Sequence, residues 1–150
     1  TELLQRLCKH PYFLLPMPKS TGREQFNLPW LQQNLSKMAR HIDPQVVQAT
    51  LVMLTANTIA EQVLQFKEVE QVYICGGGAR NEFLVKKLGS ELHECQLFTT
   101  DKLGVEADAV EAMAFAWLAY AHVNHIQGSI ASVTGAAKGA VLGTYCPGSE

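Results

Sequence analysis

The amino-acid sequence predicts an α/β fold in which parallel strands are packed by helices. Two short β-rich runs, 72–75 and 96–99, are separated by one helical pattern, and further helical patterns precede and follow them. The order helix, strand, helix, strand, helix favours a layer of parallel strands with crossover helices. Hydrophobic residues make up 47% of the 150 residues, which is the proportion of a globular domain that buries a core.

The first 42 residues are expected to form an irregular, loop-rich segment ahead of an α/β core at 43–150. Four of the six prolines lie within the first thirty residues. Pro16-Met17-Pro18 favours extended backbone, and the polar stretch 19–23 is turn-forming. That stretch fits either an ordered structural loop or the edge of a ligand cleft, and we favour the structural role.

The first helix of the core is predicted to begin at Asp43 and to run to about Gln65. Asp is a preferred N-cap residue, and Pro44 follows at the first helical position. Apolar residues recur at helical spacing on more than one side of this segment. We therefore expect the helix to be covered on both sides.

Three consecutive glycines, Gly76, Gly77 and Gly78, follow the first strand, and Asn81 is the expected N-cap of a helix that ends near Leu92. Glycine allows backbone to approach a ligand closely, and ligands bind at the carboxyl ends of parallel strands. The stretch is neither a G-x-G-x-x-G motif nor a P-loop. A ligand loop and a tight turn that merely requires glycine both remain open.

The last long helix is predicted at 108–123. Asp108 and Glu111 have the spacing of a capping box with acidic residues, and alanines recur throughout the segment. So many small and apolar residues predict a close-packed helix that is buried on nearly all sides.

Composition excludes several classes of function. The net charge of −2 argues against binding to nucleic acid, and no basic segment favours a membrane surface. The longest apolar run, 112–121, is half the length of a membrane span. Four widely spaced cysteines and the lack of an export signal predict reduced thiols and a cytoplasmic protein, and His122 and His125 are not expected to bind metal.

Three segments resemble the anhydro-N-acetylmuramic acid kinase family, and a fourth resembles the superfamily to which that family belongs. Residues 76–81 with Leu84 resemble the adenosine loop shared by sugar kinases, heat-shock ATPases and actin. The segments 18–27, 111–119 and 132–136 are similar to family segments in the same order. The resemblance implies the C-terminal lobe of an actin-like, ribonuclease H-like fold. It also implies that the phosphate-binding loop and the catalytic aspartate belong to an N-terminal part, so that no catalytic residue lies in 1–150.

The resemblance further implies a reaction, its ligands and its site residues. ATP with Mg²⁺ would phosphorylate 1,6-anhydro-N-acetylmuramic acid and open its ring, giving N-acetylmuramic acid 6-phosphate for peptidoglycan recycling. Gly76, Gly77, Gly78 and Asn81 would bind the nucleotide, Glu111 would bind the sugar, and a homodimer is compatible with these features. Two alternatives stay open: a non-catalytic α/β binding module, and another sugar kinase of the same superfamily.

Overall fold

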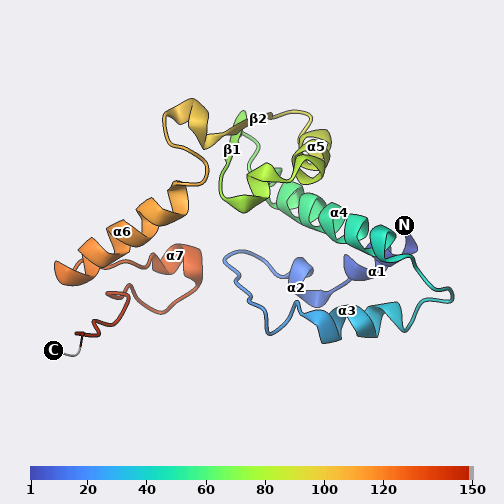
Figure 1. Ribbon diagram of the computed structural model, residues 1–150, viewed down its shortest axis with the longest axis horizontal. Coiled ribbons are helices and arrows are strands. Elements are labelled where there is room, and N and C mark those ends of the chain that lie inside the picture. Colours follow the sequence, from blue (N-terminus) through green and yellow to red (C-terminus); the bar gives the residue numbers. More distant parts are fainter. Residues whose placement is uncertain (149–150) are drawn as a thin grey trace.

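The computed structural model describes residues 1–148, and the last two residues of the predicted domain lie outside it. A small sheet and its helices occupy the top of the view in Figure 1, and two helical arms descend from it. The helices and strands are, in chain order, α1 (Glu2–Leu7), α2 (Pro11–Leu14), α3 (Leu28–Leu35), α4 (Pro44–Val63), β1 (Gln71–Ile74), the 3₁₀ turn η1 (Gly77–Arg80), α5 (Glu82–Glu91), β2 (Gln96–Thr99), the 3₁₀ turn η2 (Thr100–Leu103), α6 (Val110–Val123) and α7 (Ala131–Thr134).

The sheet confirms the predicted α/β class. β1 and β2 pair in parallel, with Gln71 opposite Gln96 and Ile74 opposite Thr99, and α5 makes the crossover between them. Parallel neighbours need a connection of this kind, which is why the strand–helix–strand pattern was informative. The sheet holds two strands among the described residues.

The long helix α4 is the central support of the structure, as its two apolar sides predicted. The Asp43 carboxylate accepts a hydrogen bond from the Gln45 N–H at 2.8 Å, and Pro44 occupies the first turn. One side of α4 contributes Leu54 to a cluster with α1. The other side contributes Ala56 and Ala60 to a second cluster. The remaining residues of these two buried clusters are Leu3, Leu4 and Leu7 in the first, and Leu88 and Leu92 in the second.

Residues 1–42 are more regular than the sequence predicted, because they contain three helices. Pro11 and Pro29 lie in the first turns of α2 and α3, where proline favours a helix start instead of breaking it. Leu3 and Leu7 of α1 are each only 1% exposed. This segment therefore supplies part of the core against α4, and is more than a connecting loop.

The stretch 19–23 has a structural role in this arrangement. The Lys19 ammonium donates hydrogen bonds to the backbone carbonyl oxygens of Tyr12, Phe13 and Leu15 at 3.0–3.4 Å. These carbonyls lie at the end of α2, where a helix leaves acceptors unpaired. The contacts support the structural role that we favoured for Lys19.

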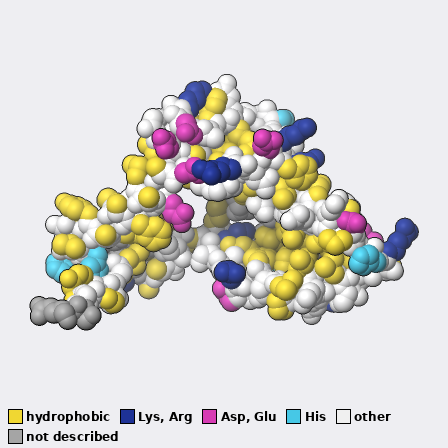
Figure 2. Space-filling model, in the orientation of Figure 1, with side chains coloured by type: hydrophobic (Ala, Val, Ile, Leu, Met, Phe, Trp, Pro, Cys, Tyr) yellow, Lys and Arg dark blue, Asp and Glu magenta, His cyan; other side chains and the backbone are white. Residues whose placement is uncertain are grey.

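The helix α6 differs most from its prediction. Its sequence predicted burial on nearly all sides, but Ala121 is its one buried residue in the described structure, and Phe115 is 64% exposed. Figure 1 shows α6 descending away from the sheet, and Figure 2 shows hydrophobic side chains on the surface of that arm. An apolar helix is buried only where other elements supply a matching surface. No helix in the described part of the chain is long and apolar enough to cross a membrane.

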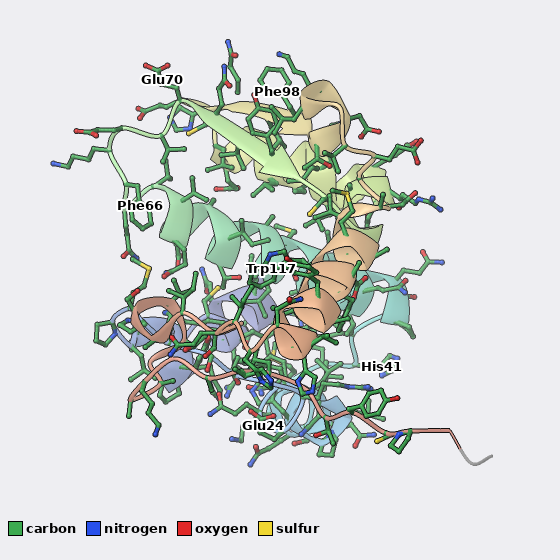
Figure 3. The ribbon with its side chains drawn as sticks, turned by 90° about the vertical axis from the view of Figure 1, so that its left-hand side faces the viewer. Glu24, His41, Phe66, Glu70, Phe98 and Trp117 are labelled. Atoms are coloured by element: carbon green, nitrogen blue, oxygen red, sulfur yellow. The ribbon has the colours of Figure 1, made fainter. Side chains whose placement is uncertain are left out.

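The end of α6 is held by the chain that follows it. Nδ1 of His122 and the Leu142 carbonyl oxygen are 3.0 Å apart, and the Gly128 N–H donates to the Ala140 carbonyl at 2.9 Å. In the side view of Figure 3, Trp117 on α6 lies well below Phe98 of β2. The C-terminal half of α6 thus contacts the segment that follows it, residues 125–142, and not the sheet.

Candidate functional site

The candidate site lies where both parallel strands end. The loop 76–80 follows β1, the turn η2 follows β2, and the segment 104–109 connects η2 to α6. A cavity of about 320 Å³ opens beside these three segments, with Arg80, Asp101 and Asp108 in its lining. The position agrees with the rule that α/β proteins bind ligands at the carboxyl ends of strands.

Gly76 is required by the conformation of the loop. Its φ of +73° is one that residues with a side chain rarely adopt. The Gly76 N–H donates to the Ala107 carbonyl oxygen at 2.8 Å, which joins the loop to the segment before α6. The 3₁₀ turn begins directly afterwards, with the Ala79 N–H donating to the Gly76 carbonyl at 3.0 Å. The tight-turn explanation is therefore sufficient for this glycine.

Gly77 and Gly78 do not have the same explanation. A Cβ atom at Gly77 would meet no atom within 4 Å, and one at Gly78 would meet only the Cδ2 atom of Leu84 at 3.6 Å. Neither residue has a φ in the left-handed region. Neither packing nor backbone conformation within the described residues requires glycine at position 77. The backbone of Gly77 is instead open to a molecule that approaches it closely.

Asn81 begins α5, as predicted. Its side-chain Oδ1 accepts a hydrogen bond from the Leu84 N–H at 3.1 Å, which satisfies one of the free donors of the first turn. The carboxamide oxygen is therefore engaged in the helix cap. Asn81 fixes the point at which the glycine loop passes into α5.

The predicted capping box of α6 is wrong. The N-cap position is Ala109, which makes no side-chain capping bond, and α6 starts two residues later than expected. Asp108 instead forms a hydrogen-bonded ion pair with Arg80. The hydrogen bond, followed by the charge of the carboxylate, raises the pKa of the Arg80 guanidinium. Asp108 thus connects the glycine loop to the start of α6.

Thr99 and Asp101 belong to the same site and were not singled out from the sequence. A hydrogen bond from the Thr99 side chain, helped by the Asp101 backbone N–H, lowers the pKa of the Asp101 carboxyl. Thr99 is the last residue of β2 and Asp101 follows two positions later, just as the glycines follow β1. The strand-end rule that selected the glycine loop applies equally to them, and would have found them.

Glu111 lies in the first turn of α6 and is exposed. No described residue donates a hydrogen bond to its carboxylate, so the capping role that we considered for it is absent. The structure does not bring Glu111 into contact with the glycine loop. Its connection to that loop runs through the backbone to Asp108 and from there to Arg80.

The remaining polar side chains show no metal centre. No three His, Cys, Asp or Glu side chains among residues 1–148 converge in an arrangement that could hold a metal ion. Cys8, Cys75, Cys95 and Cys146 are free thiols.

Fold and site together define an α/β domain with an open glycine loop at its strand ends, which is an arrangement suited to binding a small ligand. Comparison with known families identifies the domain further. The chain belongs to the anhydro-N-acetylmuramic acid kinase family, because the model of that family matches residues 1–148. The family is one of sugar kinases, so the chain belongs to an enzyme class that phosphorylates an amino sugar.

Proposed function

We propose that this chain is the adenosine-binding C-terminal lobe of an ATP-dependent kinase. The kinase would phosphorylate 1,6-anhydro-N-acetylmuramic acid and open its ring to give N-acetylmuramic acid 6-phosphate, within an actin-like two-lobed fold in the cytoplasm. Membership of the family supports the reaction. The observation that carries the nucleotide role is the open backbone of Gly77, where a Cβ atom would meet nothing.

In this proposal the glycine loop lies against adenine or ribose. The backbone of Gly77 and Gly78 forms the contact surface, because no side chain separates it from the ligand. Gly76 provides the bend that exposes this surface, and Asn81 fixes the start of α5 beneath it. ATP would bring Mg²⁺ with its phosphates, and the ion would neutralise the charge that develops during phosphoryl transfer.

The exposed apolar surface of α6 is evidence that a second lobe covers this helix in the complete kinase. Large apolar side chains of this helix, among them Phe115 and Trp117, are at least half exposed. Extended apolar surface of this kind marks an interaction site. We propose that a lobe carrying the phosphate-binding loop and the catalytic base covers this face, and that the two lobes enclose ATP and the anhydro-sugar near Glu111.

Substitution of Gly77 by Val tests the nucleotide role. The added side chain enters open space, so the melting temperature of the ligand-free chain should change little. It would nevertheless stand where the nucleotide lies, and the Kd for ADP should rise at least tenfold in isothermal titration. Gly148→Val is the matched control, because a Cβ atom at Gly148 also meets nothing and lies outside the loop.

The outcomes separate the nucleotide-binding lobe from the non-catalytic binding module. Unchanged ADP affinity in Gly77→Val would remove the loop from the nucleotide site. No saturable ADP binding by the unsubstituted chain would favour the non-catalytic binding module. The chain alone should turn over no anhydro-sugar, because positioning of the attacking water and of the γ-phosphate would depend on the other lobe.

Glu111→Gln tests the sugar role in the complete kinase. Because the Glu111 carboxylate makes no cap in α6, the substitution should leave the melting temperature unchanged. A charged hydrogen bond to a sugar hydroxyl contributes about 1.5–3 kcal/mol, so activity toward the anhydro-sugar should fall roughly tenfold or more. Full activity with Glu111→Gln would exclude the residue from the sugar site, whereas ATP binding should be normal in either case.

A further inference from the structure

Two bonds join the glycine loop to the segment that leads into α6. The first is the backbone hydrogen bond from the Gly76 N–H to the Ala107 carbonyl oxygen, at 2.8 Å. The second is the ion pair between Arg80 and Asp108. They act at the first and last residues of the loop, so both ends of the glycine loop are fixed to consecutive residues ahead of α6.

The start of α6 has little other support. Ala109 makes no side-chain cap, and the apolar side chains of the helix are largely exposed. The segment 125–142, whose Leu142 carbonyl contacts His122, lies at the opposite end of the helix. The Asp101 carboxylate also accepts a hydrogen bond from the backbone of Ala107, which precedes Asp108. Within residues 1–148, the Arg80–Asp108 pair is the one side-chain ion pair that joins the start of α6 to the α/β unit.

We propose that Arg80 and Asp108 are positioning residues, which hold the first turn of α6 and its Glu111 in a fixed relation to the glycine loop. The inference rests on the proposed function, in which the loop binds nucleotide and Glu111 binds sugar. Glu111 is the second residue of α6 and lies three residues beyond Asp108 in the sequence. Movement of Arg80 on nucleotide binding is transmitted to Glu111 through Asp108.

The exposure of the pair makes this role separable from folding. The Arg80 and Asp108 side chains are 75% and 49% exposed. Exposed ion pairs contribute little to global stability, so loss of this one should leave the melting temperature nearly unchanged. Its effect should be confined to the loop and to the first turn of α6.

Amide hydrogen exchange of the ligand-free chain, followed by NMR, tests the connection without any nucleotide. The Gly76 and Met113 amides report on it, because they donate to the carbonyls of Ala107 and Ala109. Asp108→Asn should accelerate the exchange of both amides several-fold. Glu106→Gln is the matched control, since it removes an exposed carboxylate that borders the same cavity without an ion pair.

Exchanging the two charges tests whether the ion pair itself, and not another effect of substituting Asp108, protects these amides. The double variant Arg80→Asp with Asp108→Arg restores an ion pair of opposite direction, and should return the exchange of the Met113 amide to that of the unsubstituted chain. Unchanged exchange in Asp108→Asn, or equal acceleration in Glu106→Gln, would overturn the proposal.

Titration with ADP then tests transmission to Glu111. In the unsubstituted chain, ADP should shift the amide resonances of both Gly77 and Glu111. In Asp108→Asn the Gly77 shift should persist and the Glu111 shift should be lost. A persistent Glu111 shift overturns the positioning role. A missing Gly77 shift in the unsubstituted chain contradicts the proposed function instead, while the exchange experiment still decides whether the pair holds α6.

Discussion

The helices α4 and α6 are alike in sequence and opposite in surroundings. Both are apolar on several sides and both are rich in small residues. In α4, Leu54 faces α1 while Ala56 and Ala60 face α5, so neighbouring elements cover two sides. In α6, Phe115 and Trp117 remain largely exposed.

The difference shows what an apolar helix pattern determines and what it does not. The pattern identifies the helix and the sides that are suited to burial, but the covering surface comes from other elements. For α4, that surface is supplied on one side by α1 and on the other by α5 and the sheet. For α6, no comparable surface is found in the described part of the chain.

The largest difference is expected for truncation of a core side chain. Leu54→Ala should lower the free energy of unfolding by about 2–5 kcal/mol, because it leaves a cavity between α4 and α1. Met113→Ala on α6 should cost less than about 0.5 kcal/mol, since Met113 is half exposed. Urea denaturation of both variants measures the two values, and similar losses would show that α6 is covered in solution.

Enlargement of a small residue should give the next largest effect. Ala60 is buried where α4 meets Leu88 and Leu92, so Ala60→Leu should overpack the contact and cost about 1–3 kcal/mol. Ala116→Leu makes the same change on the exposed helix and should be within about 0.5 kcal/mol of the unsubstituted chain. A destabilising Ala116→Leu in thermal unfolding of the isolated chain would contradict the comparison.

The starts of the two helices should respond differently to loss of an acidic side chain. Asp43→Ala removes the bond to the Gln45 N–H and should cost about 0.5–2 kcal/mol, most of which Asp43→Asn should retain. Glu111→Ala removes no capping bond from α6. Its unfolding free energy should therefore stay within about 0.5 kcal/mol, as measured by urea denaturation.

The smallest expected effect is a difference between the alkylation rates of two cysteine thiols. Partial burial, and then the nearby Glu61 charge, raise the pKa of Cys8 on the covered side of α4. A raised pKa means that the folded chain keeps the Cys8 thiol protonated up to a higher pH than the unfolded chain does. The stability that depends on the protonated thiol therefore falls as the pH rises through the folded pKa. Iodoacetamide at pH 8 should therefore alkylate Cys8 more slowly than the exposed Cys146, which peptide mass spectrometry can measure. Equal rates would contradict the burial of Cys8.

Local signals predicted the elements well. The N-caps Asp43 and Asn81 and the second strand lie where the sequence placed them, because each depends on neighbouring residues. The errors involve distant partners. Asp108 has the spacing of a cap but binds Arg80, which is 28 residues away in the sequence. Residue spacing carries no information about a contact that forms only after the strands have paired.

The candidate site was predictable to the same extent. The glycine loop could be located because it directly follows a strand, and Gly76 shows the positive φ that a turn requires. Gly77, unlike Gly76, is required neither by its backbone conformation nor by packing, and this depends on the space around it, which is known only from the folded structure. The same holds for the cavity beside Arg80 and Asp108.

The two-stranded sheet has a consequence for assembly. Each strand has one neighbour in the described structure, so both are edge strands with backbone N–H and C=O groups available along the outer side. Val72 and Leu97 lie opposite each other and pack toward α4 and α5, while Tyr73 and Phe98 form a pair at the next position. Because the buried contacts of the strands are made with α4 and α5 on one face, a further strand paired at an edge would leave those contacts in place.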